Sequence, residues 1–445
     1  MAENSEATSE VELEREAINE AREEGRLSLL WTFTKLAGPG WPQSAITLGG
    51  GSLASGLYLG MIGGTSMLWV QPVAMILGVI MLSAIAYVTL STRERPFEAM
   101  SRHVNPVLAW GWVTATIVAN LVWALPQFSL ATSAIRQNLS PDTLGAMADT
   151  PAKLICAGGI LVVCVTLVWF YDTGSKGVKA FEWIIRAMVG LIVLSFIGVV
   201  IKLSVAPAGI DWGNIAPGFV PNFDLLWSPP ESYIPYIEKV AGPFQDFWRD
   251  YIVANQRDRM IAAAATAVGI NMTFLLPYSM LKRGWDRDFR GLATFDLATG
   301  LFIPFMLVTS CVIIASTTQF HLQPAPGLMP GETSAEATKD VKDLRGRYEG
   351  LLAKRVKEDV GKQKFEALSE TEKKQAISEL PKADKRMAAM LVNRDAFDLA
   401  ESLRPLTGTF FARYVFGAGV VGRAISSIII LMLINGFAVC EALGI

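Results

Sequence analysis

The sequence is poor in charged residues and has no basic stripe that could bind a nucleic acid. Only 18% of its 445 residues are Asp, Glu, Lys or Arg, whereas 51% are hydrophobic. An average soluble domain carries more charge and fewer apolar residues. Because the formal net charge is −2 and no basic run with interleaved aromatic residues occurs, we exclude nucleic-acid binding.

The sequence also lacks the patterns of an enzyme or of a zinc or haem site. Its four cysteines lie in apolar runs without CxxC spacing, and its two histidines, His103 and His321, lie at the ends of such runs. No nucleophile beside a base and no paired intramembrane carboxylates are found. We therefore predict no enzymatic activity and no cofactor, and we expect oxygen or backbone ligands for any bound metal.

No cleavable signal peptide is visible, because residues 1–26 are rich in Glu and lack a basic segment followed by an apolar core. What the chain does contain is a series of apolar runs too long for a soluble protein. They predict an all-α, multi-pass protein of the plasma or inner membrane. The runs, about eight, are Leu36–Ile62, Met67–Leu90, Val107–Ile135, Leu154–Tyr171, Val178–Leu203, Met260–Leu281, Leu292–Thr317 and 409–445.

Lys and Arg in the short loops predict the orientation, because such residues favour the cytoplasmic side. They follow the second, fourth and sixth runs and include Arg93, Arg95, Arg102, Lys176, Lys179, Lys282, Arg283, Arg287 and Arg290. The N-terminus is therefore expected in the cytoplasm.

This orientation divides the chain into four parts. They are an acidic cytoplasmic segment (1–35), a core of about seven spans (36–318) with an extracellular cap (204–259), an extracellular insert (319–408) and an eighth span (409–445). The insert mixes Lys with Asp and Glu, which is typical of a solvated helical hairpin, and Ser369 with Glu372 predicts a helix N-cap there.

The first span contains three successive glycines, which disfavour a continuous helix. Unwound backbone inside a membrane is tolerated only where it lines a cavity or is buried in protein, and transporters build their binding sites in this way. We therefore predict a substrate site formed by Thr47, Gly49, Gly50, Gly51 and Ser52. The alternative is that the small residues simply allow close helix packing.

The sixth span carries a corresponding interruption, from Gly269 to Thr273 and then at Pro277. Two interrupted helices at matching positions of two halves are typical of an inverted-repeat transporter. Asn271 and Thr273 could each coordinate a cation through oxygen or satisfy backbone groups that Pro277 leaves free.

Two charged residues in the fifth span stand four positions apart. Glu182 and Arg186 share one helical face near the predicted cytoplasmic end, which favours a structural or gating salt bridge over a proton relay. In the third span, Asn120 and Gln127 are polar but cannot titrate, so no proton carrier is evident there.

Several short motifs resemble the natural resistance-associated macrophage protein (Nramp) family of divalent-metal transporters. They are Gly38-Pro39-Gly40 with Ser44 and the glycine run, residues 66–70 (SMLWV), residues 90–94 (LSTRE), residues 177–182 (GVKAFE) and Ser426-Ser427. The resemblance implies a leucine-transporter-like fold of two inverted five-helix repeats with discontinuous first and sixth helices. It also implies that family members continue beyond residue 445, so that the chain is truncated or lacks the last helices.

The resemblance also shows three departures from the family pattern. The Asp-Pro-Gly-Asn motif of the first helix aligns with Gly49, Gly50, Gly51 and Ser52, so the charged metal ligand is lost. Met-Pro-His of the sixth helix aligns with residues 273–275, which replaces a sulfur ligand by an oxygen. The acidic positions of the third helix align with Asn120 and Trp123, which cannot release protons.

These departures predict a permease for a hard divalent cation such as Mg²⁺, working by alternating access without proton coupling. The tentative metal ligands are Ser52, Asn271 and Thr273. The predicted partners are a metal cation or small solute and the lipid bilayer. The alternative is a non-transporting receptor or scaffold that acts through the insert at 319–408.

Overall fold

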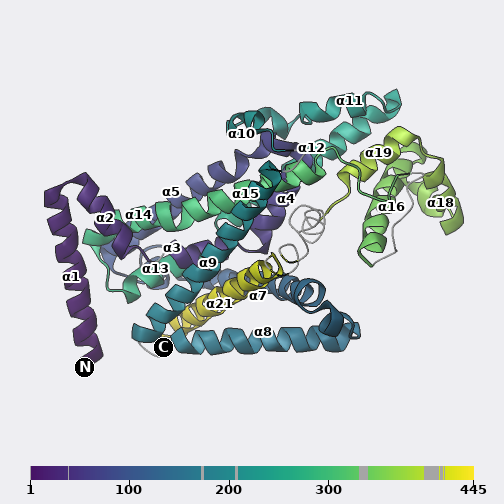
Figure 1. Cartoon of the computed structure of the whole chain (residues 1–445). Coiled ribbons are helices and arrows are strands. Elements are labelled where there is room, and N and C mark those ends of the chain that lie inside the picture. The colour runs from purple at the N-terminus through teal and green to yellow at the C-terminus, as the bar shows by residue number, and fades with distance from the viewer. Residues whose placement is uncertain are drawn as a thin grey trace.

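The computed structural model describes residues 2–444 except 39, 172–174, 206–208, 330–338, 395–409, 411–413 and 415. For residues 2–10, 50, 170, 171, 175–182, 185, 188, 192, 339–343 and 416 only the backbone is described. Within this part of the chain all regular elements are helical and no β-strand occurs, as the sequence predicts. Figure 1 shows an elongated helical body with the N-terminal helix at one end and the insert at the other.

Six helical segments of the described chain are long and apolar enough to cross a membrane, or seven if one bent pair counts as a single span. Within the described residues each of the eight apolar runs is mostly helical, and the multi-pass prediction is confirmed. The helices are α3 (Gly40–Thr47), α4 (Gly50–Gly63), α5 (Val70–Thr92), α7 (Pro106–Ala134), α8 (Asp149–Tyr171), α9 (Ser175–Ser204), α12 (Gln245–Ala267), α13 (Met272–Lys282), α14 (Arg290–Asp296), α15 (Ile303–Phe320) and α21 (Phe416–Leu443).

Both predicted helix breaks are present. The axes of α3 and of the helix that follows it are bent by 54°, at the glycine run. Residues 268–271 separate α12 from α13. The sequence-based prediction of a fold with discontinuous first and sixth helices is therefore confirmed.

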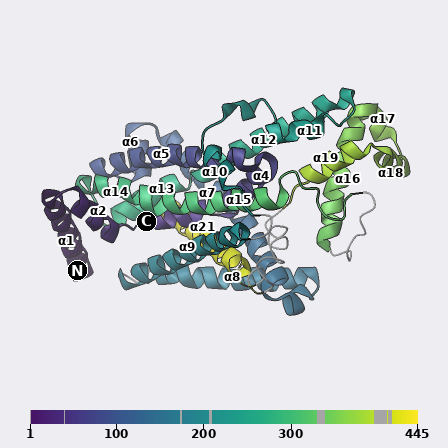
Figure 2. The ribbon, with the colours of Figure 1, turned by 45° about the horizontal axis from the view of Figure 1, so that its top comes forward.

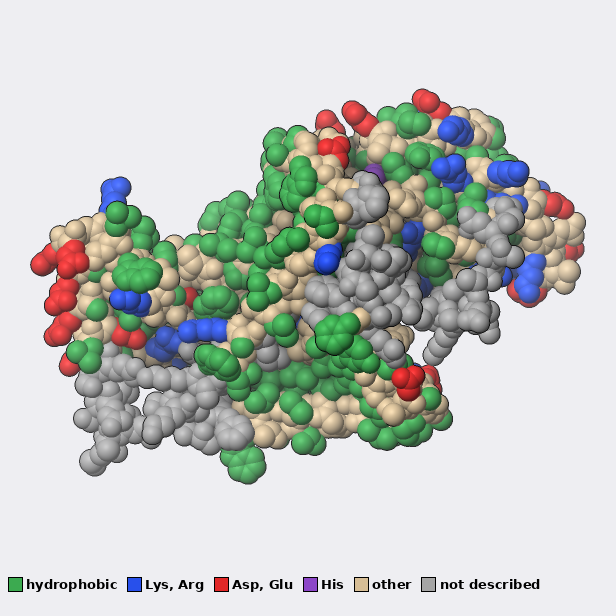
Figure 3. Space-filling model, in the orientation of Figure 1, with side chains coloured by type: hydrophobic (Ala, Val, Ile, Leu, Met, Phe, Trp, Pro, Cys, Tyr) green, Lys and Arg blue, Asp and Glu red, His purple; other side chains and the backbone are tan. Residues whose placement is uncertain are grey.

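The centre of the body is built by α21, which packs along α7 and also contacts α3, α9 and α13. On the other side, α4 packs between α12 and α15 (Figure 2). The outer faces of α7 and α8 carry exposed apolar side chains such as Leu125, Leu154 and Trp169. Figure 3 shows apolar side chains over the middle of the molecule and charged ones gathered toward its ends, as a membrane protein requires.

Short helices cover the two ends. Near one end, α1 (Ala2–Glu24) and α2 (Arg26–Leu36) precede the first span, and α6 (Pro96–His103) follows α5. Arg15 of α1 pairs with Asp286, 2.7 Å away, in the loop after α13. At the other end, α10 (Trp212–Gly218) and α11 (Ile234–Ile237) belong to the predicted cap. The cap borders a cavity of about 1140 Å³ that reaches α4 and α15.

The insert folds into α16 (Lys339–Val360), α17 (Lys362–Ala367), α18 (Glu370–Glu379) and α19 (Lys382–Leu391). The predicted helix N-cap at Ser369 is present at the start of α18, where Ser369 and Glu372 form a reciprocal capping box. The insert differs from a freely solvated hairpin, because buried Asp384 accepts hydrogen bonds from Trp248 Nε1 of α12 at 2.8 Å and Arg355 Nε of α16 at 2.9 Å. A buried charged contact therefore fixes the insert to the start of α12.

Candidate functional site

The carboxyl end of α3 is the first part of the candidate site, and most of its carbonyl groups have donors. The Leu48 and Gly49 N–H groups donate to Ser44 O at 2.8 Å and Ile46 O at 2.9 Å. Two further carbonyls are capped by α21, because Ser427 Oγ donates to Ala45 O at 3.1 Å and Arg423 Nη1 to Leu48 O at 3.3 Å. The last carbonyls of a helix need such partners when the helix ends inside a protein.

The glycines at the break allow neighbouring helices to come close. A Cβ atom at position 49 would lie 2.8 Å from Ile46 O and 3.5 Å from Ser427 Oγ. A Cβ at position 51 would lie 2.8 Å from Thr266 Cγ2. The glycine run therefore interrupts the helix and also permits close packing against α12 and α21, and its role as a substrate site stays a prediction. Gly50 begins α4.

Ser52 faces the end of α12. Its side chain is 1% exposed, and its Oγ donates to Thr266 O at 3.1 Å. The hydroxyl uses its single proton in this hydrogen bond. Ser52 therefore joins the two broken helices, and its predicted role as a metal ligand stays a prediction.

At the second break, the two candidate residues have different surroundings. Asn271, directly before α13, is 5% exposed, and its Oδ1 has no hydrogen-bond partner among the described residues. Thr273 Oγ1 instead donates to Ile270 O and accepts from Trp112 Nε1 of α7 at 3.2 Å. Thr273 thus satisfies the backbone of the break, whereas the buried Asn271 oxygen is available to a ligand.

Met272 is a site residue that the sequence reasoning missed. It is fully buried, and its Sδ accepts a hydrogen bond from Thr47 Oγ1 at 3.4 Å. Thr47 Oγ1 also lies 2.9 Å from Gln43 O. A sulfur atom therefore lies at this break, one position before Thr273, with which the methionine of the family motif aligns. The position of Met272, next to Asn271 at the start of α13, is the signal that would have found it.

Thr47 and Met272 bring the two breaks into contact, and the groups around them are mostly uncharged. No cluster of three or more His, Cys, Asp or Glu side chains that could hold a metal exists within the described residues. Gln43 of α3 is fully buried, and in the part of the chain that the structure describes neither its Nε2 nor its Oε1 has a hydrogen-bond partner. The fixed charge at this place is Arg423, which is 2% exposed. Neutral oxygen donors, one thioether and one guanidinium therefore surround the breaks.

A separate charged cluster holds the amino-terminal end of α3. Arg186 Nη2 donates to Ala37 O at 3.1 Å, and the buried Asp296 carboxylate accepts from Gly40 N. The Arg283 guanidinium lies so close to Gly38 that a Cβ there would be 2.2 Å from its Nη2. Arg186 is thus a contact of the segment that enters the broken helix. The Glu182 side chain lies outside the described residues, so its predicted pairing stays a prediction.

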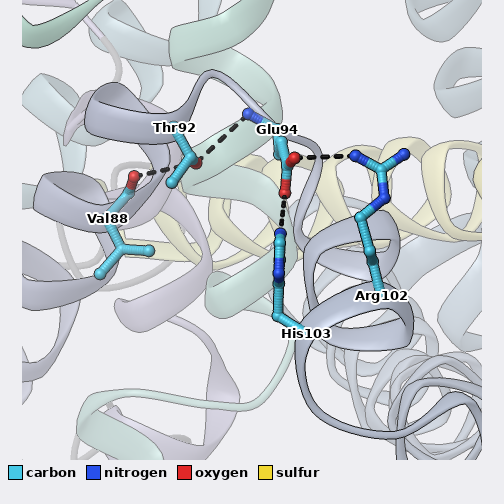
Figure 4. Close-up of polar contacts among 5 residues, drawn as sticks. All are labelled: Val88, Thr92, Glu94, Arg102 and His103. Atoms are coloured by element: carbon cyan, nitrogen blue, oxygen red, sulfur yellow. Dashed lines mark hydrogen bonds and ion pairs between the residues drawn. The ribbon is translucent and has the colours of Figure 1, made fainter.

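Another polar cluster is shown in Figure 4, in the loop between α5 and α6. Glu94 pairs with Arg102 and His103, each at 2.9 Å. His103 has a side chain that is 60% exposed, and such solvated pairs add little to stability. This cluster is a surface ion pair and offers no metal site.

Comparisons with known proteins agree with the fold. The family model described as natural resistance-associated macrophage protein-like matches residues 40–352. No curated protein matches the sequence significantly.

Among solved structures, a glutamate-to-glutamine variant of the Eremococcus coleocola manganese transporter is similar, with 14% identity, a TM-score of 0.51 and coverage of 93% of this chain and 72% of that one. The same transporter in complex with an aromatic bis-isothiourea compound matches with 12% identity, a TM-score of 0.45 and coverage of 94% and 72%.

Proposed function

The chain belongs to the Nramp family, and from this premise we propose that it moves a hard divalent cation such as Mg²⁺ across a membrane. The observation that carries the proposal is the contact between the two helix breaks, at Thr47 and Met272, beside the unpartnered and buried Asn271 oxygen. Discontinuous helices that meet in the interior are the usual site of substrate binding in such folds.

The ligands we propose are Asn271 Oδ1, Thr47 Oγ1 and carbonyl oxygens of the breaks. Oxygen ligands suit hard cations, and Mg²⁺ keeps several of its waters when protein ligands are few. The Met272 thioether is the one soft group, and it favours a transition metal such as Mn²⁺. In this state Met272 Sδ accepts a hydrogen bond from Thr47, so we propose that the oxygen atoms dominate the selectivity.

We propose that transport occurs without proton coupling. Asn120 of α7 is fully buried, cannot titrate, and donates to Asn435 Oδ1 at 2.8 Å. Two buried acids in the spans bond to backbone instead, since Asp296 accepts from Gly40 N and Glu441 from Phe97 N. Asp296 thus caps the amino-terminal end of α3, and Glu441 caps the start of α6.

We propose that the end of the molecule that carries α1 faces the cytoplasm and that the insert faces outside. The two lie at opposite ends of the helical body (Figure 1). Arg283, Arg287 and Arg290 follow α13 in the loop that α1 contacts through Asp286. Basic short loops favour the cytoplasmic side.

The experiment is uptake into proteoliposomes that contain a divalent-cation dye, with Mg²⁺, Mn²⁺ or Ca²⁺ outside and with or without a pH gradient. Saturable Mg²⁺ uptake that does not respond to the gradient is the expected result. Uptake that requires the gradient would reject the absence of coupling, and no uptake of any divalent ion would reject the proposal as a whole.

A second candidate is a non-transporting scaffold, which the rigid attachment of the insert through Asp384 favours. If the protein is a scaffold, deletion of residues 339–394 should abolish its function, and Asn271→Ala should have no effect. If it is a permease, Asn271→Ala should reduce cation uptake.

A further inference from the structure

Arg423 is a buried cation that the proposed ion site does not explain. It lies in α21, is 2% exposed, and donates from Nη1 to Leu48 O at 3.3 Å. Within the part of the chain that the structure describes, Arg423 makes no ion pair, and its Nε has no hydrogen-bond partner. A charged residue inside a membrane span is costly, and such residues usually have a functional reason.

The surroundings of Arg423 are those that would attract a free cation. The carboxyl end of a helix carries a partial negative charge and exposes carbonyl groups. Half-helix carboxyl ends and unwound carbonyls coordinate cations in discontinuous helices. Arg423 reaches the last of these carbonyls, and Ser427, one turn further along α21, reaches Ala45 O at 3.1 Å. Donors from α21 thus occupy the acceptors at the end of α3.

We propose that Arg423 is a tethered cation that occupies the carboxyl end of α3 while no metal is bound, and that the transported ion displaces it from Leu48 O. This inference rests on the proposed function. Two cations repel each other strongly at short range in a poorly solvated site. A divalent ion that binds between the two breaks therefore competes with the guanidinium, and Arg423 acts as a positioning residue that sets the affinity.

The tethered cation has a consequence for the transport cycle. A carrier without a coupling ion must return empty after it has released its substrate. Exposed carbonyls without a partner are unfavourable in the interior of a membrane protein, and Arg423 supplies that partner in the empty state. Net uptake includes the return of the empty carrier, whereas exchange of one metal ion for another does not. Loss of Arg423 should therefore harm net uptake more than exchange.

The test compares the full-length protein with Arg423→Gln and Arg423→Lys in proteoliposomes, with Mn²⁺ as the probe. Net uptake is measured into metal-free vesicles, and exchange is measured into vesicles loaded with Mn²⁺. For Arg423→Gln we expect the ratio of net uptake to exchange to fall about tenfold, and Mn²⁺ to bind more tightly because its competitor is gone. Arg423→Lys keeps the charge and should restore much of the ratio.

Ser427→Ala is the matched control, because it removes a neutral donor from the same face of α21. It should change net uptake and exchange by the same factor. Equal loss of both modes in folded Arg423→Gln protein, or weaker Mn²⁺ binding by that variant, would overturn the displacement role.

If the unaltered protein neither binds nor transports Mn²⁺, binding by Arg423→Gln alone would show that Arg423 occupies the cation site permanently, which would overturn its displacement by a transported ion together with the permease. Absence of binding in both proteins would reject the two proposals together.

Discussion

Replacing Asp384 by Ala should weaken the attachment of the insert to the rest of the protein. The Asp384 side chain is fully buried and accepts from Trp248 Nε1 at 2.8 Å and Arg355 Nε at 2.9 Å. Without it, the Arg355 guanidinium stays buried against the Phe244 ring, and its other acidic neighbour, Asp359, is 3.9 Å away and half exposed. Removing one partner of a buried ion pair costs about 3–5 kcal/mol.

Hydrogen exchange of the backbone amides measures this loss, because amides of α16–α19 exchange through opening of the insert. A cost of about 4 kcal/mol corresponds to about a thousandfold faster exchange. The matched control is Glu366→Ala, which removes an exposed partner of Lys357, 3.2 Å away, and should change stability by less than about 1 kcal/mol. Similar exchange rates in the two variants would refute the reasoning about the buried contact.

Three further predictions concern the breaks and the cap. Met272→Leu keeps the side-chain volume and removes the sulfur, so Mg²⁺ uptake should persist. If the variant lost more Mg²⁺ uptake than Mn²⁺ uptake, selectivity based on oxygen ligands would be contradicted. Gly49→Val places its Cβ 2.8 Å from Ile46 O of α3. This crowding should lower the free energy of unfolding by about 1–3 kcal/mol and strongly reduce uptake, and normal uptake by a folded variant would contradict the need for glycine at this break. Burial lowers the pKa of His321, because the folded protein favours the neutral ring. The contribution of the neutral His321 ring to the free energy of unfolding should be complete above about pH 6.5 and should be lost as the pH falls through the lowered pKa. Thermal unfolding between pH 5 and 7.5 should show this loss, which His321→Asn should reduce.

The pH effect has a structural basis in the contacts of the His321 ring. Nδ1 lies 3.1 Å from Met61 O, which can only accept, so this nitrogen carries the proton. Nε2, 3.0 Å from Ser232 Oγ, then accepts from the hydroxyl. Protonation of Nε2 would replace that acceptor by a donor in a largely buried position. The neutral ring therefore joins the end of α4 to the cap.

The spans and both breaks could be predicted from the sequence, because the physics behind them is local. A membrane span must be apolar over its whole length, and three adjacent glycines disfavour a helix wherever they occur. The helix N-cap at Ser369 could also be predicted, since its hydrogen bonds join residues three positions apart.

The contacts that distinguish the candidate ligands could not be predicted, because they join residues far apart in the sequence. Thr273 Oγ1 is engaged because Trp112 of α7 donates to it. The approach of Arg423 to Leu48 joins residues 375 positions apart. The buried Asp384 contact likewise joins α19 to α12 and α16, and a mixed-charge segment gives no sign of which carboxylate will be buried.

The most direct measurement of the proposed ion site is Mn²⁺ binding to the purified protein, followed by electron paramagnetic resonance, with and without Asn271→Ala. Mn²⁺ serves as a paramagnetic probe for hard divalent ions, which use similar oxygen ligands. We predict saturable binding that Mg²⁺ displaces and that Asn271→Ala weakens at least about tenfold, because the buried oxygen is lost. Binding that is unchanged in Asn271→Ala would contradict an ion site at the contact between the two helix breaks.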